Sequence, residues 1–304
     1  MRDNFGNATT GAPIVVKVDE ASRLVNLSAR AWVGPGEAGA PGEQGIFAGF
    51  VIPGPGPRRI LLRGIGPALG QFGVASPLRS ARLFVYDSQG KVIHSNAGWD
   101  RSPAASILAS ATDFASLGAF PLAPGSGDAA MVIEVEPGAY TAALSGQVDP
   151  ATQRPDVGVG LIELYEYDRR ADRLVNLSAR VTVGIGGEVA IPGLAVRGAV
   201  SKRLLVRAVG PGLAAFGVSS PLADPRLELR DESGRIIGGN DDWSAQPGAA
   251  EVRQAAATVG AFALTEGSRD AAQLLTVTPG NYTVVVNGAP ATTGIALVEV
   301  YEVP

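Results

Sequence analysis

Apolar residues in this chain come in short runs or alternate with polar residues. An alternating pattern is typical of β-strands, in which successive side chains point to opposite faces. In the first half of the chain the pattern predicts strands at residues 24–33, 46–52, 59–65, 82–86, 91–95, 130–135, 140–145 and 158–167.

Turn and helix signals separate these runs. Asp87-Ser-Gln-Gly90 has Asp first and Gly fourth, which predicts a type I turn and a hairpin. Glu136-Pro-Gly-Ala139 predicts a turn between the next two strands, so we expect a meander of hairpins. Residues 67–72 predict one short helical turn. Residues 104–117, and their counterpart at 249–259, predict an Ala-rich amphipathic helix.

The chain contains the same pattern twice. RLVNLSAR at residues 23–30 recurs at residues 173–180, 150 positions later (173 − 23). Matches continue to the end, where Glu163 pairs with Glu299 at an offset of 136 (299 − 163). The sequence therefore predicts an all-β fold of two tandem antiparallel β-sandwich, jelly-roll-like domains, each with one short excursion helix. The boundaries expected are an arm at 1–20, repeat 1 at 21–168 and repeat 2 at 169–304.

Composition narrows the classes of function. An apolar fraction of 46% over 304 residues is enough for packed cores, and 40 Gly with 22 Pro suit many tight turns. The net charge of −4, with scattered basic residues, gives no footprint for nucleic acid. The absence of Cys excludes thiol catalysis and disulfides. No apolar run reaches the length of a membrane span.

The repeated motifs resemble a known kind of module. RLVNLSAR, Gly210-Pro-Gly-Leu-Ala-Ala-Phe-Gly-Val218 and the closing Leu297-Val-Glu-Val-Tyr-Glu302 resemble an uncharacterised repeat of large secreted bacterial proteins. Pro279-Gly-Asn-Tyr-Thr283 is similar to the pre-peptidase C-terminal β-sandwich class. Both resemblances imply an extracellular or cell-surface accessory or structural module without catalytic activity.

The arm contains a strand-like run of its own. Ile14, Val15, Val16 and Val18 lie just before the first RLVNLSAR, as the strand at 161–167 lies before the second. The chain thus carries three closing-type strands for two sheets. The arm could be an ordinary first strand of repeat 1, a relic of a longer array, or a strand that adds to a neighbouring molecule. The last alternative would join copies head to tail into a filament.

Tryptophans are candidates for sugar binding. Trp99 and Trp243 occupy matched positions just before the helix, which suits a core plug between helix and sheet at least as well as a sugar platform. Trp32 has Thr182 as its counterpart, so Trp32 is the better candidate for a surface contact.

Each polar residue that could bind a metal or act in catalysis also has a simpler structural explanation. Asp241 and Asp242 could hold Ca²⁺, with Asp231 or Asp270 nearby, but a solvated turn explains them too. His94 is the single histidine and is expected at the surface, so no catalytic triad and no enzyme activity are expected. Polar residues also interrupt apolar strands at matched positions, namely Arg63 with Arg207, expected in solvent-facing or inter-domain ion pairs, and Asn26 with Asn176, expected to fix a bend.

Together these patterns favour a structural protein of the cell exterior. The expected role is a subunit or segment of a filament or surface assembly, with copies of the same chain as partners. The alternative is a polysaccharide-binding accessory module of a secreted protein.

Overall fold

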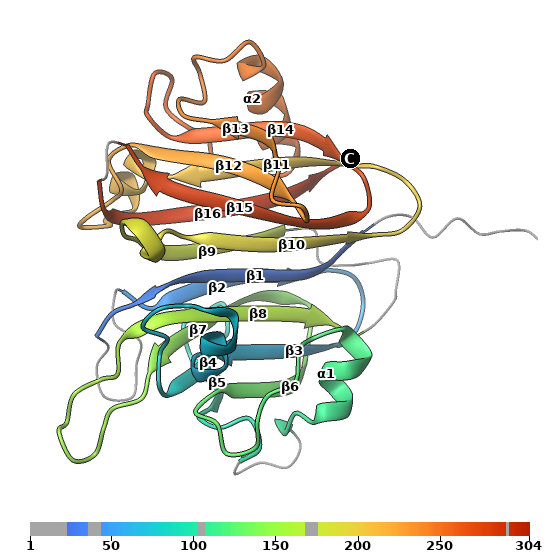
Figure 1. Ribbon diagram of the computed structural model, residues 1–304. Coiled ribbons are helices and arrows are strands. Elements are labelled where there is room, and N and C mark those ends of the chain that lie inside the picture. The colour runs from blue at the N-terminus through green and yellow to red at the C-terminus, as the bar shows by residue number, and fades with distance from the viewer. Residues whose placement is uncertain (1–22, 36–43, 102–106, 168–175, 290–291) are drawn as a thin grey trace, which may run out of the picture.

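The computed structural model describes residues 23–35, 44–101, 107–167, 176–289 and 292–304 (Figure 1). The expected all-β fold with a few short helices is confirmed. In the first repeat the elements are β1 (Arg23–Val33), β2 (Ile46–Ile52), β3 (Arg58–Ile65), η1 (Pro67–Phe72), β4 (Ala81–Tyr86), β5 (Val92–Asn96), α1 (Ala111–Leu117), β6 (Ala129–Val135), β7 (Gly138–Gly146) and β8 (Gly158–Glu166).

The second repeat follows the same order. Its elements are β9 (Asn176–Val183), η3 (Gly186–Glu188), β10 (Ile191–Arg197), β11 (Lys202–Val209), η4 (Pro211–Phe216), β12 (Pro225–Asp231), β13 (Ile236–Asn240), α2 (Ala249–Thr258), β14 (Ala271–Val277), β15 (Gly280–Gly288) and β16 (Gly294–Val303). Among the described residues no helix has the length and apolar character needed to cross a membrane.

The strands form two antiparallel runs, and each run crosses from one repeat into the other. One run has the order β6-β3-β8-β1-β10-β15-β12-β13. The other has the order β14-β11-β16-β9-β2-β7-β4-β5. A single pair, Trp32 with Thr182, joins β1 to β9 at the centre of the molecule. The β-sheet pairing is therefore continuous across the boundary between the repeats.

The two runs face each other across one apolar core. Strands at equivalent places in the two runs are in contact, among them β1 with β2, β8 with β7 and β11 with β12. The largest buried cluster takes residues from both repeats, such as Ile46 and Leu144 from the first and Val206 and Val284 from the second. Figure 1 shows the strands stacked in one column from β13 and β14 to β5 and β6. Burial of this shared core holds the repeats together.

The first strand of each repeat bridges the two repeats. β1 pairs along one edge with β8 of its own repeat and along the other with β10 of the second repeat. β9 likewise pairs with β16 of its own repeat and with β2 of the first repeat. Each repeat thus gives its RLVNLSAR strand to the other in a reciprocal exchange.

Two glycines accommodate this exchange. Gly193 lies opposite Ser28, and Gly49 lies opposite Ser178. A Cβ at Gly193 would lie 2.7 Å from the Ser28 Oγ, and a Cβ at Gly49 would lie 2.8 Å from the Ser178 Oγ. Since real Cβ atoms do not approach so closely, a larger residue at either glycine would force the facing serine hydroxyl to move. The identical octapeptide therefore forms the contact that joins the repeats.

Asn26 follows a bend in β1, as its place in the octapeptide predicts. The β1–β10 register shifts between Leu24 and Asn26, which marks a β-bulge. The Asn26 side-chain amide donates a hydrogen bond to the Leu164 carbonyl at 3.4 Å. This bond ties the bent strand to β8.

The structure agrees with the predicted turns and strands more closely than with the predicted order in which the strands pair. The β4–β5 hairpin is confirmed, with the Gly90 N–H donating to the Asp87 carbonyl at 3.0 Å. The meander of hairpins is wrong, because β6 and β7 belong to different runs and the turn at Glu136–Ala139 crosses between layers. The predicted first helix is shorter than expected, since a capping box starts α1 only after Ser110. The expected jelly-roll-like connection within separate domains stays a prediction.

Candidate functional site

Each repeat contains a buried Arg–Glu–Tyr group. In the first repeat, Arg63 on β3 lies directly opposite Glu163 on β8. The Arg63 Nε lies 3.3 Å from the Glu163 Oε2, and the Tyr165 hydroxyl donates to the Glu163 Oε1 at 3.0 Å. All three side chains are buried.

The second repeat has the same group. Arg207 on β11 lies opposite Glu299 on β16, with the Arg207 Nε 3.1 Å from the Glu299 Oε2. The Tyr301 hydroxyl donates to the Glu299 Oε1 at 2.6 Å. Arg207 also donates from its Nη1 to the Phe262 carbonyl at 2.8 Å. The matched geometry shows that this group belongs to the frame of the repeat.

The expectation that Arg63 and Arg207 face solvent or pair between domains is wrong. Strand alternation does place each arginine on the face opposite the shared core, as expected. That second face is covered by α1 or α2 and the loops around it, so Leu61 and Ile65, on the same face as Arg63, are buried in a separate apolar cluster. The arginines are 0% exposed and pair within their own repeats.

Burial dominates the electrostatics of these groups. It raises the pKa of Glu163 and of Glu299 above the usual carboxyl range, although the facing arginine and the tyrosine hydroxyl partly oppose the shift. Burial, followed by the nearby carboxylate, raises the pKa of Tyr165 and Tyr301. Each tyrosine therefore remains a proton donor to its carboxylate at all ordinary pH values.

An aromatic ring covers each guanidinium. The Arg63 Cζ lies 4.2 Å from the ring centroid of Phe120, and the Arg207 Cζ lies 4.4 Å from that of Phe262. Some N–H groups still have no hydrogen-bond partner among the described residues: Nη1 and Nη2 of Arg63, and Nη2 of Arg207. A buried charged donor without an acceptor is costly, and these atoms have almost no accessible surface, so they weaken the fold and are out of reach of solvent.

The two matched tryptophans are core residues. Trp99 is 7% exposed and its indole N–H donates to the Ala123 carbonyl at 2.9 Å. Trp243 is 2% exposed and donates to the Thr265 carbonyl at 3.1 Å. Both lie under the helix of their repeat, which leaves no exposed ring face for a sugar.

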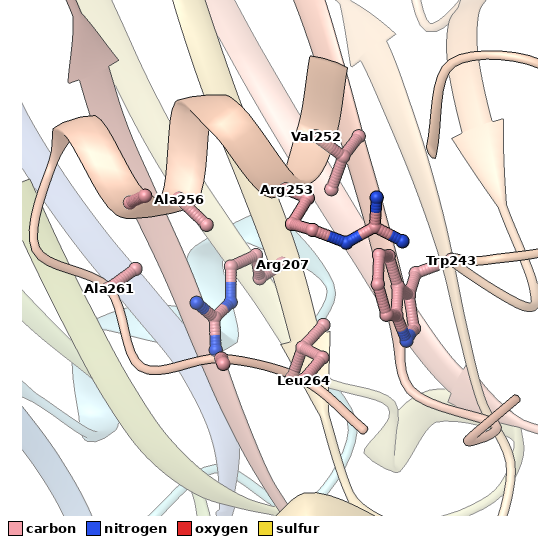
Figure 2. Close-up of a pocket in the computed structure, with 9 residues that line it drawn as sticks. Arg207, Trp243, Val252, Arg253, Ala256, Ala261 and Leu264 are labelled. Atoms are coloured by element: carbon pink, nitrogen blue, oxygen red, sulfur yellow. The ribbon is translucent and has the colours of Figure 1, made fainter. Parts of the chain in front are cut away.

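The second repeat contains a cavity next to its buried Arg207. It has a volume of about 210 Å³ beneath α2 and is lined by Arg207, Trp243, Val252, Arg253, Ala256, Ala257, Ala261, Ala263 and Leu264 (Figure 2). Figure 2 shows Ala256, Ala261 and Leu264 around the Arg207 side chain. The counterpart of Ala256 is Phe114, 142 positions earlier (256 − 142). Phe114 is 1% exposed, and its ring lies 5.4 Å from that of Trp99 and 4.8 Å from the Arg63 Cζ. A benzyl group in the first repeat thus takes up the corresponding place.

Trp32 lines a different cleft, at the junction of the repeats. This cleft has a volume of about 380 Å³ and also includes Arg30, Phe72, Ile185 and Glu188. Phe72 and Ile185 are each 58% exposed, whereas Trp32 is half-buried. Trp32 therefore remains a candidate surface contact, with both apolar and charged neighbours.

The acidic residues proposed for Ca²⁺ lie apart. Asp241 pairs with Arg226 at 3.0 Å, and Asp231 accepts hydrogen bonds within its own turn. Asp270 is buried and accepts from the backbone N–H groups of Gly210 and Gly212. The part of the chain that the structure describes contains no group of three or more His, Asp or Glu side chains placed to hold a metal ion. Binding of Ca²⁺ by Asp241 and Asp242 stays a prediction.

The assembly arm, with Ile14, Val15, Val16 and Val18, lies outside the described residues.

His94 on β5 is half-buried, and burial lowers the pKa of its imidazole. The hydroxyls of Tyr140 and Tyr282 donate to the carbonyls of Glu136 at 2.9 Å and Thr278 at 2.6 Å, four residues earlier in each case.

Comparison with known proteins adds little. No protein-family description matches the chain, and no curated protein matches it. Among solved structures, a DUF4785 family protein from Legionella pneumophila subsp. pneumophila str. Philadelphia 1 is similar at 8% identity and a TM-score of 0.27, covering 91% of this chain and 80% of that one. A likeness at this level carries no conclusion about function.

The cavity beneath α2 was not anticipated from the sequence, although a signal for it exists. In the aligned helices the buried Phe114 of the first repeat corresponds to the half-buried Ala256 of the second. Arg253 likewise replaces Ala111 (253 − 142). Loss of a large apolar residue at a matched core position indicates an unfilled space.

Proposed function

We propose that the chain is an extracellular structural protein, a subunit or segment of a filament or surface assembly joined by β-strand addition. The reciprocal strand exchange supports this function best. β1 and β9 each pair with their own repeat on one edge and with the other repeat on the other edge. A sheet that already accepts a strand from a second repeat is suited to accept one from a second molecule.

Further strands can be added only at the ends of the two runs. Within the described residues, β5, β6, β13 and β14 each pair with one neighbouring strand. The outer edge of β6 is engaged at Ala130, whose N–H donates to the Asn96 Oδ1 at 3.1 Å. The outer edge of β14 is engaged at Ala272, which bonds the Asn240 and Gln246 side chains. This leaves β5 and β13 as the acceptor edges.

Each of these two edge strands begins with an exposed apolar residue. Val92 on β5 is 43% exposed and Ile236 on β13 is 53% exposed. Exposed apolar edge strands favour addition of another strand, because pairing satisfies backbone groups and buries the side chains together. Both edges are short, so they fit a run such as residues 14–18 of the arm.

The reach of the arm favours a second molecule as its partner. Four residue steps separate Asp19 from Arg23, which an extended chain covers in at most about 14 Å. The position outside β13 lies five strand spacings from β1, about 24 Å at about 4.8 Å each. The position outside β5 lies in the other layer, still further from β1 than the arm can reach. The arm therefore pairs with a neighbouring copy, and repetition of this contact builds a filament.

Electron microscopy of the full chain and of a chain lacking residues 1–20 tests the proposal. We expect the full chain to form long polymers and the shortened chain to remain monomeric and folded. Val16→Ser should weaken assembly, whereas Lys17→Ser, on the opposite face of the run, serves as the matched control. Equal polymers from both chains, or a monomeric full chain at every concentration, would contradict strand addition.

The cleft at the junction favours polysaccharide binding as the second candidate function. Trp32, Phe72 and Ile185 supply apolar contact area beside Arg30 and Glu188, a mixture that suits sugar rings and their hydroxyls. Glycan-array binding that is lost in Trp32→Ala, with Trp243 intact, would support this candidate. An unchanged binding profile would exclude Trp32.

A further inference from the structure

The cavity beneath α2 has the size and surroundings of a binding site for one ring. In the first repeat the place corresponding to Ala256 holds the ring of Phe114, which packs against Trp99 and over Arg63. In the second repeat Trp243 and Arg207 keep those positions, while Ala256 leaves about 210 Å³ unfilled. A protein cavity of about 150 Å³ is large enough to bind benzene. The second repeat thus has room for a ring that the first repeat supplies itself.

The walls combine apolar and cationic groups. Val252 and Ala256 lie four residues apart on one face of α2, and Ala261 and Leu264 come from the segment that follows the helix. Arg207 lies at the closed side, 0% exposed, and its Nη2 lacks a hydrogen-bond partner among the described residues. Figure 2 shows its guanidinium between α2 and that following segment. Glu299 and the Phe262 carbonyl hold this guanidinium in place at the wall of the cavity.

A second guanidinium lies at the open side. The Arg253 Cζ is 5.5 Å from the ring centroid of Trp243, and the Arg253 Nη2 lies 2.6 Å from the Glu266 Oε2. The Arg253 side chain is 55% exposed, so it can move with little cost. Both arginines carry a full positive charge at any ordinary pH. Each guanidinium is already paired, Arg207 with the buried Glu299 and Arg253 with the exposed Glu266. An exposed ion pair contributes little, so a ligand carboxylate can replace Glu266 beside Arg253.

We infer that the second repeat binds a small aromatic carboxylate of the benzoate class in this cavity. The ring takes the place that Phe114 occupies in the first repeat, against Trp243 and the alanines of α2. The carboxylate accepts hydrogen bonds from the Arg253 guanidinium in place of Glu266. The inference is independent of strand addition, because the cavity lies on the helix-covered face and not at a sheet edge.

Titration of the full chain with benzoate, toluene and acetate tests the inference by isothermal calorimetry. Benzoate should bind once per chain, at least about tenfold tighter than toluene, since a charge-assisted bond is worth roughly 1.5–3 kcal/mol and every 1.4 kcal/mol is tenfold. Acetate lacks the ring and should give no saturable signal. Absence of saturable benzoate binding, or equal affinity for benzoate and toluene, would overturn the inference.

Filling the cavity provides the matched control. Ala256→Phe reproduces the first repeat and should weaken benzoate binding at least tenfold, while Ala250→Phe, on an exposed position of the same helix, should leave it unchanged. Circular dichroism and the unfolding temperature confirm that both variants are folded. Equal binding by Ala256→Phe and the parent chain would place the ligand elsewhere and refute the site.

Discussion

The helix-covered faces of the two repeats share one frame and differ in how they are filled. Both have a buried Arg–Glu–Tyr group, a tryptophan bonded to a loop carbonyl, and a phenylalanine stacked on the arginine. The first repeat has the buried ring of Phe114, whereas the second has Ala256 beside a cavity. The comparison separates the residues that the fold needs in both repeats from a position at which the two repeats differ.

The residues that both repeats keep are those that satisfy buried polar groups. Asp128 and Asp270 are both 0% exposed, and each accepts hydrogen bonds from the backbone at the start of the 3₁₀ turn of its own repeat, η1 or η4. A buried charge that loses its partner is costly, so these residues are held in both copies. An apolar ring has no such partner, so its loss leaves only a cavity.

Breaking the ion pair should have the largest effect and should not distinguish the repeats. Glu163→Ala leaves Arg63 buried without its carboxylate, and Glu299→Ala does the same to Arg207. We expect each change to lower the free energy of unfolding by about 3–5 kcal/mol. Urea denaturation measures both losses. A loss below about 1 kcal/mol in either repeat would show that its ion pair contributes little.

Exchanging the residues at the helix position should separate the repeats. Phe114→Ala opens a cavity in the first repeat and should cost about 3–5 kcal/mol. Ala256→Phe adds a ring to space that is already present, so it should leave stability unchanged or raise it. Urea denaturation of the two variants checks the difference. Equal destabilisation by both changes would mean that the cavity does not fit a ring.

A smaller difference lies in the hairpins, where His94 of β5 corresponds to Gly238 of β13, 144 positions later (238 − 94). Burial lowers the pKa of His94, so between the folded-state and unfolded-state pKa values the folded chain binds fewer protons. His94 therefore contributes stability above its unfolded-state pKa of about 6.5, and that stability is lost as the pH falls through the folded-state pKa.

Comparison with His94→Asn isolates this contribution. Glu163 and Glu299 have raised pKa values, so their contributions are lost as the pH rises, but they are the same in both proteins. We expect the parent chain to lose more stability than His94→Asn between pH 8 and pH 5 in urea titrations. The same loss in both proteins would show that His94 is not coupled to folding.

Local sequence signals predicted most of the fold. The strand at Ile46–Ile52 and the 3₁₀ turn at Pro67–Phe72 begin and end where the sequence predicts. These elements depend on alternation and on turn residues, which act over a few positions. The matched positions of Trp99 and Trp243 left a core plug and a sugar platform both open, and burial of both rings decides for the core.

The remaining features depend on contacts between distant segments. β2 and β10 are equivalent acceptors for an RLVNLSAR strand, so the sequence does not say whether β1 pairs with its own repeat or the other. Strand alternation places Arg63 on the second face of β3 but does not say that a helix covers it. The cavity follows from the mismatch between Phe114 and Ala256 only once that covered face is known.

Disulfide trapping tests strand addition most directly, because the chain has no native Cys. A chain carrying Val16→Cys is mixed with one carrying Ile236→Cys, or with one carrying Val92→Cys, under mild oxidation. Strand addition brings side chains of adjacent strands to about 4.5–5.5 Å between Cβ atoms. The account predicts mixed dimers linked between the arm and an edge strand. Mixtures that yield no mixed dimer with either edge would contradict it.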